Sequence, residues 1–160
     1  MATNVRFNNY LEGLTKKQRL MACEAIEQYL VGETENVEQI LRGIDVYKAN
    51  RDLCNKDEEY FILMCLDVKH KLLKKVEISH GLLTACFVDV RVLMREALLS
   101  NAVNIVVVHN HPSGIVTPSI DDSQLTRKIQ DACNIMDIHL IDHVIVGGND
   151  YFSFREDGRL

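Results

Sequence analysis

The spacing of apolar residues changes along the chain, and its N-terminal part has one spacing while the rest has another. In the N-terminal part, apolar residues recur roughly every three to four positions in a polar background, as they do in amphipathic helices. The pattern predicts a helix over residues 16–31 that Thr15 caps. It then predicts a short helix over residues 37–41 that ends at Gly43, followed by a polar segment over residues 46–56.

Dense apolar runs replace this spacing from Tyr60 onward, and turn residues separate the runs. Such runs indicate buried strands. The sequence predicts strands over residues 60–66, 72–79, 103–108, 140–146 and 151–154. Apolar residues at helical spacing predict helices over residues 88–100 and 120–136. The alternation of strand and helix predicts an α/β domain over residues 58–160, with residues 1–57 as a helical accessory region.

Composition narrows the class of protein. The 160 residues are enough for one domain with a small appendage, and an apolar content of 47% supports a buried core. The net charge of -5 argues against a general nucleic-acid binder, because affinity for phosphates comes from clustered Lys and Arg. No apolar run approaches the roughly 18 residues that a membrane span needs. The 5 cysteines form no C-x-x-C pair, which excludes a disulfide scaffold and fits a reducing, cytoplasmic compartment.

Candidate chemistry concentrates in the segment after the predicted strand 103–108. His109 and His111 are two residues apart on an extended chain, so their side chains point to the same face, and Pro112 favours an extended His111. Neutral imidazole nitrogens bind Zn²⁺, and a catalytic zinc site needs a third protein ligand and an open position. Asp122, in the first turn of the next predicted helix, can be that ligand. Two histidines and a carboxylate form the ligand set of many zinc hydrolases.

Each part of this pattern also has a purely structural interpretation. An isolated H-x-H pair is more often a surface or core feature than a metal site. Ser119, with an acidic residue three positions later, is nearly a capping box, and acidic side chains suit the positive end of a helix dipole. His143 could orient a metal ligand or serve as a hydrogen-bonded core residue.

The complete string from His109 to Asp122 favours the functional interpretation. It reads H-N-H-P-S-G-I-V-T-P-S-I-D-D and resembles the JAMM signature of the JAB/MPN metalloprotease superfamily, which is H-x-H, seven residues, then S-x-x-D. The form H-N-H-P-S-G resembles the bacterial RadC-like branch, and so do residues 95–98, 142–147 and 151–154. The resemblance covers about residues 59–160. It implies a JAB/MPN-like (cytidine-deaminase-like) mixed β-sheet flanked by helices.

The resemblance also implies residue roles. His109, His111 and Asp122 resemble the ligands of one zinc ion per chain, with water at the fourth position. Ser119 resembles the residue that stabilises the tetrahedral oxyanion. A glutamate that resembles the general base lies just before the first core strand in the superfamily, and Glu59 fits that position.

Other glutamates compete with Glu59 for the role of the base. Glu58 is its neighbour, but side chains alternate along a strand, so only one of the two can point inward. Glu77, on the next predicted strand, and Glu96, on the predicted helix 88–100, are further candidates.

The resemblance implies a zinc-dependent hydrolase of amide or isopeptide bonds, acting on an unidentified peptide or protein. The alternative is a non-catalytic metal-binding module of a RadC-like DNA-repair or mobile-element protein, although the acidic charge does not support nucleic-acid binding. A zinc deaminase is excluded because its signature requires H-x-E and P-C-x-x-C. The oligomeric state, a homo-oligomer included, stays open.

Overall fold

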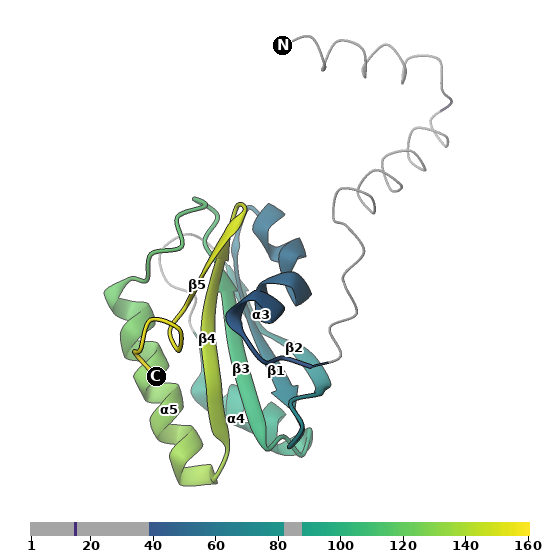
Figure 1. Cartoon of the computed structure of the whole chain (residues 1–160), viewed down its shortest axis with the longest axis vertical. Coiled ribbons are helices and arrows are strands. Elements are labelled where there is room, and N and C mark those ends of the chain that lie inside the picture. The colour runs from purple at the N-terminus through teal and green to yellow at the C-terminus, as the bar shows by residue number, and fades with distance from the viewer. Residues whose placement is uncertain (1–14, 16–38, 82–87) are drawn as a thin grey trace. The chain divides into compact units, whose positions relative to one another are not determined.

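The computed structural model describes Thr15 and residues 39–81 and 88–160, and residues 39 onward belong to one compact unit. The helix predicted over residues 16–31 lies outside the described residues. The helices are α3 (Gly43–Ala49), the 3-10 helix η1 (Arg51–Asn55), α4 (Val90–Leu99) and α5 (Ile120–Met136). The strands (Figure 1) are β1 (Glu59–Leu66), β2 (Leu72–Gly81), β3 (Asn104–Asn110), β4 (His139–Gly147) and β5 (Asp150–Ser153).

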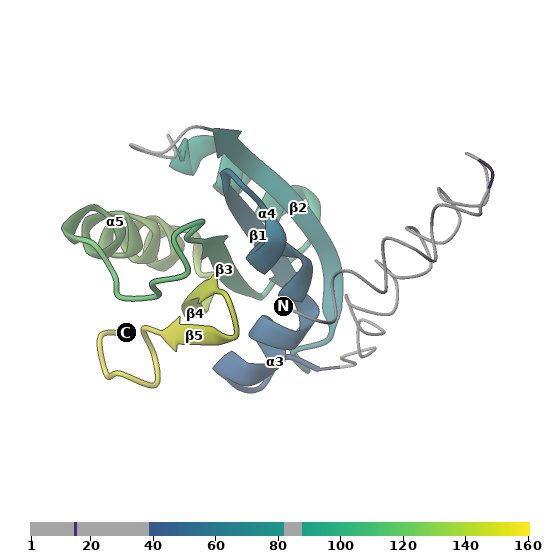
Figure 2. The ribbon, with the colours of Figure 1, turned by 90° about the horizontal axis from the view of Figure 1, so that it is seen from above.

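The strands form one mixed sheet in the order β2-β1-β3-β4-β5. Strand β1 pairs antiparallel with β2 and β3, β4 pairs antiparallel with β5, and β3 and β4 run parallel. A parallel pair needs a crossover connection, and α5 supplies it here. Helices α4 and α5 cover one face of the sheet, and α3 and η1 cover the other (Figure 2). The predicted α/β fold, a mixed sheet flanked by helices, is confirmed.

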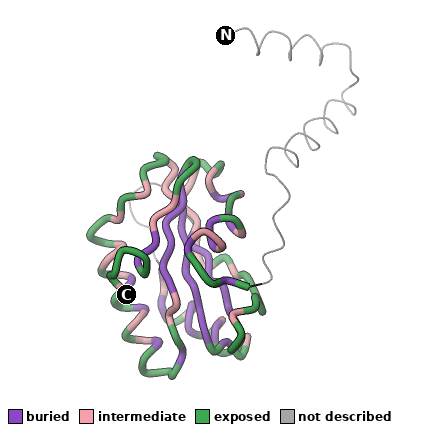
Figure 3. Tube along the Cα trace, viewed as in Figure 1, coloured by how far each residue is buried: buried purple, intermediate pink, exposed green. Residues whose placement is uncertain are grey.

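Burial on both faces explains the unbroken apolar run of β1. Phe61, Leu63 and Cys65 lie in the core beneath α4 and α5. Ile62 and Met64 point the opposite way, into the core beneath α3 and η1. Figure 3 shows the central strands buried along most of their length, with exposed positions gathered on the outer faces of the helices. Successive side chains of a strand face opposite sides, so a strand between two helical layers is apolar throughout.

The prediction of a short helix that ends at Gly43 is wrong for the described residues. Residues 39–42 are not helical, and α3 begins at Gly43. A Cβ atom at this position would lie 2.7 Å from Cε2 of Tyr151, so the close approach of β5 requires glycine. The Gly43 amide also donates a hydrogen bond to Oε1 of Glu156 at 3.0 Å. Contacts with residues far along the chain therefore place this glycine at the start of a helix.

The described residues before β1 pack on the sheet. Ile40, Val46 and Leu53 are buried in the core beneath α3 and η1, together with side chains of β1, β3 and β4. This part of the predicted accessory region thus belongs to the same compact unit as the sheet. Of the helices that the structure describes, none is both long and apolar enough to cross a bilayer.

The connection from β3 to α5 holds the predicted site at one end of the sheet. The His111 amide donates a hydrogen bond to the carbonyl of Val146 on β4, at 3.0 Å, as the chain leaves β3. Ser119 then caps α5: its hydroxyl accepts from the Asp122 amide at 3.1 Å, and its own amide donates to the Asp122 carboxylate at 2.7 Å. The capping box expected from the sequence is confirmed, and it fixes the first turn of α5 beside the end of β3.

Candidate metal centre

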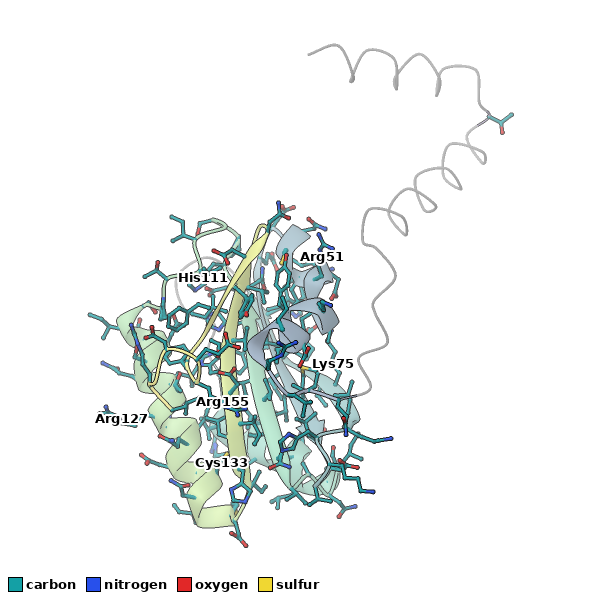
Figure 4. The ribbon with its side chains drawn as sticks, viewed as in Figure 1. Arg51, Lys75, His111, Arg127, Cys133 and Arg155 are labelled. Carbon is teal, nitrogen blue, oxygen red and sulfur yellow. The ribbon has the colours of Figure 1, made fainter. Side chains whose placement is uncertain are left out.

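Three of the predicted site residues converge on one point. Nε2 of His109 lies 3.2 Å from Nε2 of His111 and 3.1 Å from Oδ1 of Asp122. Nε2 of His111 lies 3.7 Å from Oδ2 of Asp122. His109 lies near the end of β3, His111 directly follows that strand, and the carboxylate comes from the first turn of α5. Figure 4 labels His111 at the end of the sheet where the β3–α5 connection leaves it.

These distances can be compared with those of a zinc site. Ligand atoms about 2.0–2.1 Å from a tetrahedral zinc ion lie roughly 3.3 Å from one another. Nε2 of His109 is 3.2 Å from Nε2 of His111 and 3.1 Å from Oδ1 of Asp122, and both separations are close to that value. The 3.7 Å contact of His111 is with the other carboxylate oxygen, Oδ2. Two imidazole nitrogens and one carboxylate also form a donor set that suits zinc. The residues present therefore fit a three-ligand zinc site with an open position.

Glu59 lies beside this group at the start of β1. Its Oε1 is 3.8 Å from Nε2 of His111, and one potential ligand atom each from Glu59, His109 and His111 lie within 4.8 Å of one another. Both carboxylates are therefore candidate ligands. Asp122 is the nearer one, because it contacts both imidazoles at 3.1 and 3.7 Å. Glu59 is then left as a half-buried carboxylate beside the two imidazoles.

The competing glutamates have partners elsewhere. The carboxylate of Glu77 lies 2.6 Å from Nδ1 of His80, on the exposed strand β2. Glu96 pairs with Lys74 at 3.1 Å and with Arg95 at 2.9 Å. Of these three carboxylates, the structure brings Glu59 to the histidines.

Asn110 holds the start of β1 in place, and sequence reasoning missed it. Its Oδ1 accepts from the amide of Tyr60 at 2.7 Å, and its Nδ2 donates to the carbonyl of Glu58 at 2.9 Å. Asn110 lies between the two histidines on β3, so its side chain points away from them and toward β1. Its amide is buried, 1% exposed, and hydrogen-bonded at both its oxygen and its nitrogen, which only the folded structure reveals. By fixing both neighbours of Glu59, it fixes the position of that carboxylate.

The outer nitrogens of both histidines are hydrogen-bonded away from the site. Nδ1 of His111 lies 2.6 Å from the carbonyl of Ile115, which can only accept, so Nδ1 of His111 carries a proton. Nδ1 of His109 lies 2.9 Å from Nε2 of His143, inside the core. In a neutral His111 the Nε2 atom therefore presents its lone pair to Asp122, as a metal ligand must.

The electrostatic field of the site favours a cation. A hydrogen bond with Asp122 raises the pKa of His111, against the opposing effect of burial. Burial acts to raise the pKa of Asp122, but hydrogen bonds with His109 and His111 outweigh it and lower that pKa well below its usual range. The carboxylate thus stays ionised at neutral pH and attracts positive charge. A divalent ion at this point would meet a preformed anion.

The inner side of the site is aromatic and closed. The ring of Phe61 stacks on His109 with centroids 5.8 Å apart, and the ring of Phe154 stacks on His143 at 4.9 Å. His143 is fully buried, and burial lowers its pKa well below the usual value, so this imidazole is neutral. The structure confirms His143 as a hydrogen-bonded core residue, and its partner is the proposed ligand His109, so a role in orienting that ligand stays a prediction.

Residues 40–159 match the sequence model of the family described as RadC-like JAB domain. A UPF0758 protein of Histophilus somni strain 2336 is 36% identical over 148 residues, which cover 91% of this chain and 67% of that protein. A UPF0758 protein of Burkholderia thailandensis is 40% identical over 141 residues, which cover 88% of this chain and 51% of that protein. The chain thus spans about half to two thirds of the length of these curated relatives.

Proposed function

Because the chain belongs to the RadC-like JAB domain family, we propose that it is a zinc-dependent hydrolase of amide or isopeptide bonds. One observation supports this proposal above the others. The imidazoles of His109 and His111 and the carboxylate of Asp122 converge at the spacing of zinc ligands, with a second carboxylate, Glu59, beside them. A purely structural zinc site would have four protein ligands, whereas three ligands and a neighbouring base are the set of a hydrolase.

His109, His111 and Asp122 would hold the ion. A bound zinc ion supplies Lewis acidity at this point, because it polarises a carbonyl and lowers the pKa of water to about 7. The capping box keeps Asp122 in place, since the Ser119 amide and hydroxyl both donate to its Oδ2, at 2.7 and 2.6 Å. The substrate we propose is an amide of a peptide or protein.

Glu59 is the proposed general base. A carboxylate accepts the proton of the attacking water and then donates it to the departing amine, so that one residue serves both steps. Its Oε1 is 3.8 Å from the His111 imidazole, which is a separation that leaves room for one water molecule to contact both. The two hydrogen bonds between Asn110 and the backbone on either side of Glu59 hold this carboxylate in position.

Ser119 is the proposed donor to the oxyanion of the tetrahedral intermediate. Its hydroxyl lies 2.6 Å from Oδ2 of Asp122 and donates to it in the structure. A role toward the substrate therefore requires the hydroxyl to rotate away from Asp122 when the carbonyl oxygen becomes negative. The capping interactions through the Ser119 amide would persist during this rotation.

We place this activity in the cytoplasm. Cys54, Cys65 and Cys133 are free thiols, and burial raises the pKa of Cys133 to about 11, so it is unreactive. Free thiols of this kind fit a reducing compartment.

The test compares the chain with two charge-neutralising variants, Glu59→Gln and its matched control Glu58→Gln, on a library of peptide and isopeptide amides. Zinc content is measured in each preparation. We expect the wild type and Glu58→Gln to cleave at least one amide, and Glu59→Gln to bind zinc but lose activity by about 10²- to 10⁴-fold. Zinc-loaded wild type that cleaves no amide would contradict the hydrolase and favour a non-catalytic metal-binding module.

A further inference from the structure

Behind the proposed metal centre, a row of hydrogen bonds runs from one candidate ligand to another through the core. Nδ1 of His109 is 2.9 Å from Nε2 of His143, and Nδ1 of His143 is 2.6 Å from Oγ1 of Thr126. Oγ1 of Thr126 is in turn 2.6 Å from the backbone carbonyl of Asp122. His109, His143 and Thr126 are all 3% exposed or less, so water does not replace these partners.

The direction of each hydrogen bond follows from the fixed end of the row. The carbonyl of Asp122 can only accept, so the single hydroxyl proton of Thr126 is directed to it. The Thr126 oxygen then has only lone pairs to offer to His143, which must donate from Nδ1. If Thr126 instead donated its proton to His143, its oxygen and the Asp122 carbonyl oxygen would lie 2.6 Å apart with no proton between them.

The second nitrogen of His143 is therefore an acceptor. His143 is enclosed by the rings of Phe61 and Phe154, and no carboxylate of the described residues hydrogen-bonds to it, so it holds one proton, on Nδ1. Its Nε2 accepts from Nδ1 of His109, so His109 carries a proton on Nδ1, and its Nε2 faces Oδ1 of Asp122 at 3.1 Å. In the metal-free chain this Nε2 donates to the carboxylate, and a zinc ion would take the place of that proton. In most metal sites a carboxylate, a carbonyl or water takes the outer proton of a ligand histidine, and here a second histidine does.

We propose that Thr126 and His143 are positioning residues that set the tautomer of His109 and tie its position to that of Asp122. The two candidate ligands come from different elements, β3 and α5, and the row joins them through β4. Thr126 is one turn after Asp122 on α5, so any shift of that first turn is transmitted to His109. The inference rests on the proposed function only in taking zinc as the ion that these residues bind.

The proton positions are tested first, in the metal-free wild-type chain, by ¹⁵N NMR of the histidine rings. We expect a proton on Nδ1 of both His109 and His143, and none on Nε2 of His143. Isolated neutral histidine carries its proton mainly on the other nitrogen, so a merely structural role would not predict this result. A proton on Nε2 of His143, or an unprotonated Nδ1 of His109, would overturn the proposal.

Zinc affinity is tested second, with Thr126→Val, which removes the hydroxyl at nearly constant shape, and Thr126→Ser, which keeps it. We expect Thr126→Val to weaken zinc binding by about ten- to a hundredfold, and Thr126→Ser to bind within a few-fold of wild type. Equal affinities in the two variants would overturn the proposal. Neither experiment measures hydrolysis, so a chain that cleaves no amide would refute the proposed function while these results still decide the inference.

Discussion

His111 lies between two carboxylates, and its charge depends on them. Nε2 of His111 is 3.7 Å from Oδ2 of Asp122 and 3.8 Å from Oε1 of Glu59. Without a metal ion, a proton on this nitrogen relieves the concentration of negative charge, which is why the pKa of His111 is raised. A zinc ion would compete with that proton for the same lone pair.

The pH dependence of the metal-free chain follows from this competition. Protonated His111 stabilises the folded state because its pKa is higher there than in the unfolded chain, where it is about 6.5. This stabilisation is complete when the pH is below the unfolded-state pKa, and it is lost as the pH rises through the folded-state pKa. We expect the free energy of unfolding of the chelator-treated chain to fall as pH rises above neutrality, measured by urea denaturation. The hydrogen bond with Asp122 is the largest cause of the shift, so Asp122→Asn should flatten this slope, and an unchanged slope would refute the assignment.

Ser119 has two separable roles. Ser119→Ala removes the cap of α5 and should lower the free energy of unfolding by about 1 kcal/mol, measured by urea denaturation. If it also stabilises the oxyanion, kcat should fall by roughly 10²- to 10³-fold, well beyond any effect of stability. Ser123→Ala is the control, because its hydroxyl only donates to the Ser119 carbonyl at 3.1 Å. Loss of stability with unchanged kcat would leave Ser119 as a cap alone.

Residue spacing predicted which side chains could form the site, but not what supports them. His109 and His111 had to share a face because they are two apart on a strand, and alternation favoured one of Glu58 and Glu59. The row through Thr126 and His143 depends on the parallel register of β3 and β4, in which Val107 lies opposite His143. No local pattern reports a register between strands that a 17-residue helix separates.

At the level of elements, the apolar runs from Tyr60 onward predicted the strands because burial on two faces leaves a continuous apolar signal. The region before β1 was harder to predict, because a glycine can mark either end of a helix. At Gly43, the deciding contact is with Tyr151 on β5, more than a hundred residues away along the chain. A helix boundary set by such a distant contact leaves no trace in the local sequence.

Gly43→Ala tests that explanation. Alanine favours a helix over glycine by about 1 kcal/mol, so a helix without this contact would become more stable. Here the new Cβ would lie 2.7 Å from the Tyr151 ring and 3.0 Å from Cβ of Ser153, and we expect a net loss of about 1–3 kcal/mol in urea denaturation. The cost should shrink in a Tyr151→Ala background, where the ring is absent. A stabilised Gly43→Ala chain would contradict the close approach.

At the level of the whole molecule, the proposed site joins the layers of the fold. Its candidate residues come from β1, β3 and the start of α5, which are distant in sequence and meet only in the folded chain. An ion that binds this arrangement and not the unfolded chain stabilises folding by mass action. At a free zinc concentration of about 100 times the dissociation constant, the gain is about 2.7 kcal/mol.

Thermal unfolding with and without zinc tests this coupling. We expect zinc to raise the melting temperature of the wild-type chain, a chelator to reverse the rise, and His109→Ala to abolish it. Calcium serves as the control ion, because two imidazoles are poor ligands for it. A rise that persists in His109→Ala would place the stabilising zinc elsewhere on the chain.

The most direct test of the central claim is the zinc stoichiometry of a matched pair of variants, Asp122→Asn and Asp121→Asn. The two aspartates are adjacent in the first turn of α5, but only Asp122 contacts the imidazoles, and Asp121 is exposed. Elemental analysis after dialysis against low free zinc should find about one zinc ion per chain in the wild type and in Asp121→Asn, and little in Asp122→Asn. Equal zinc in both variants, or none in the wild type, would contradict the site described by His109, His111 and Asp122.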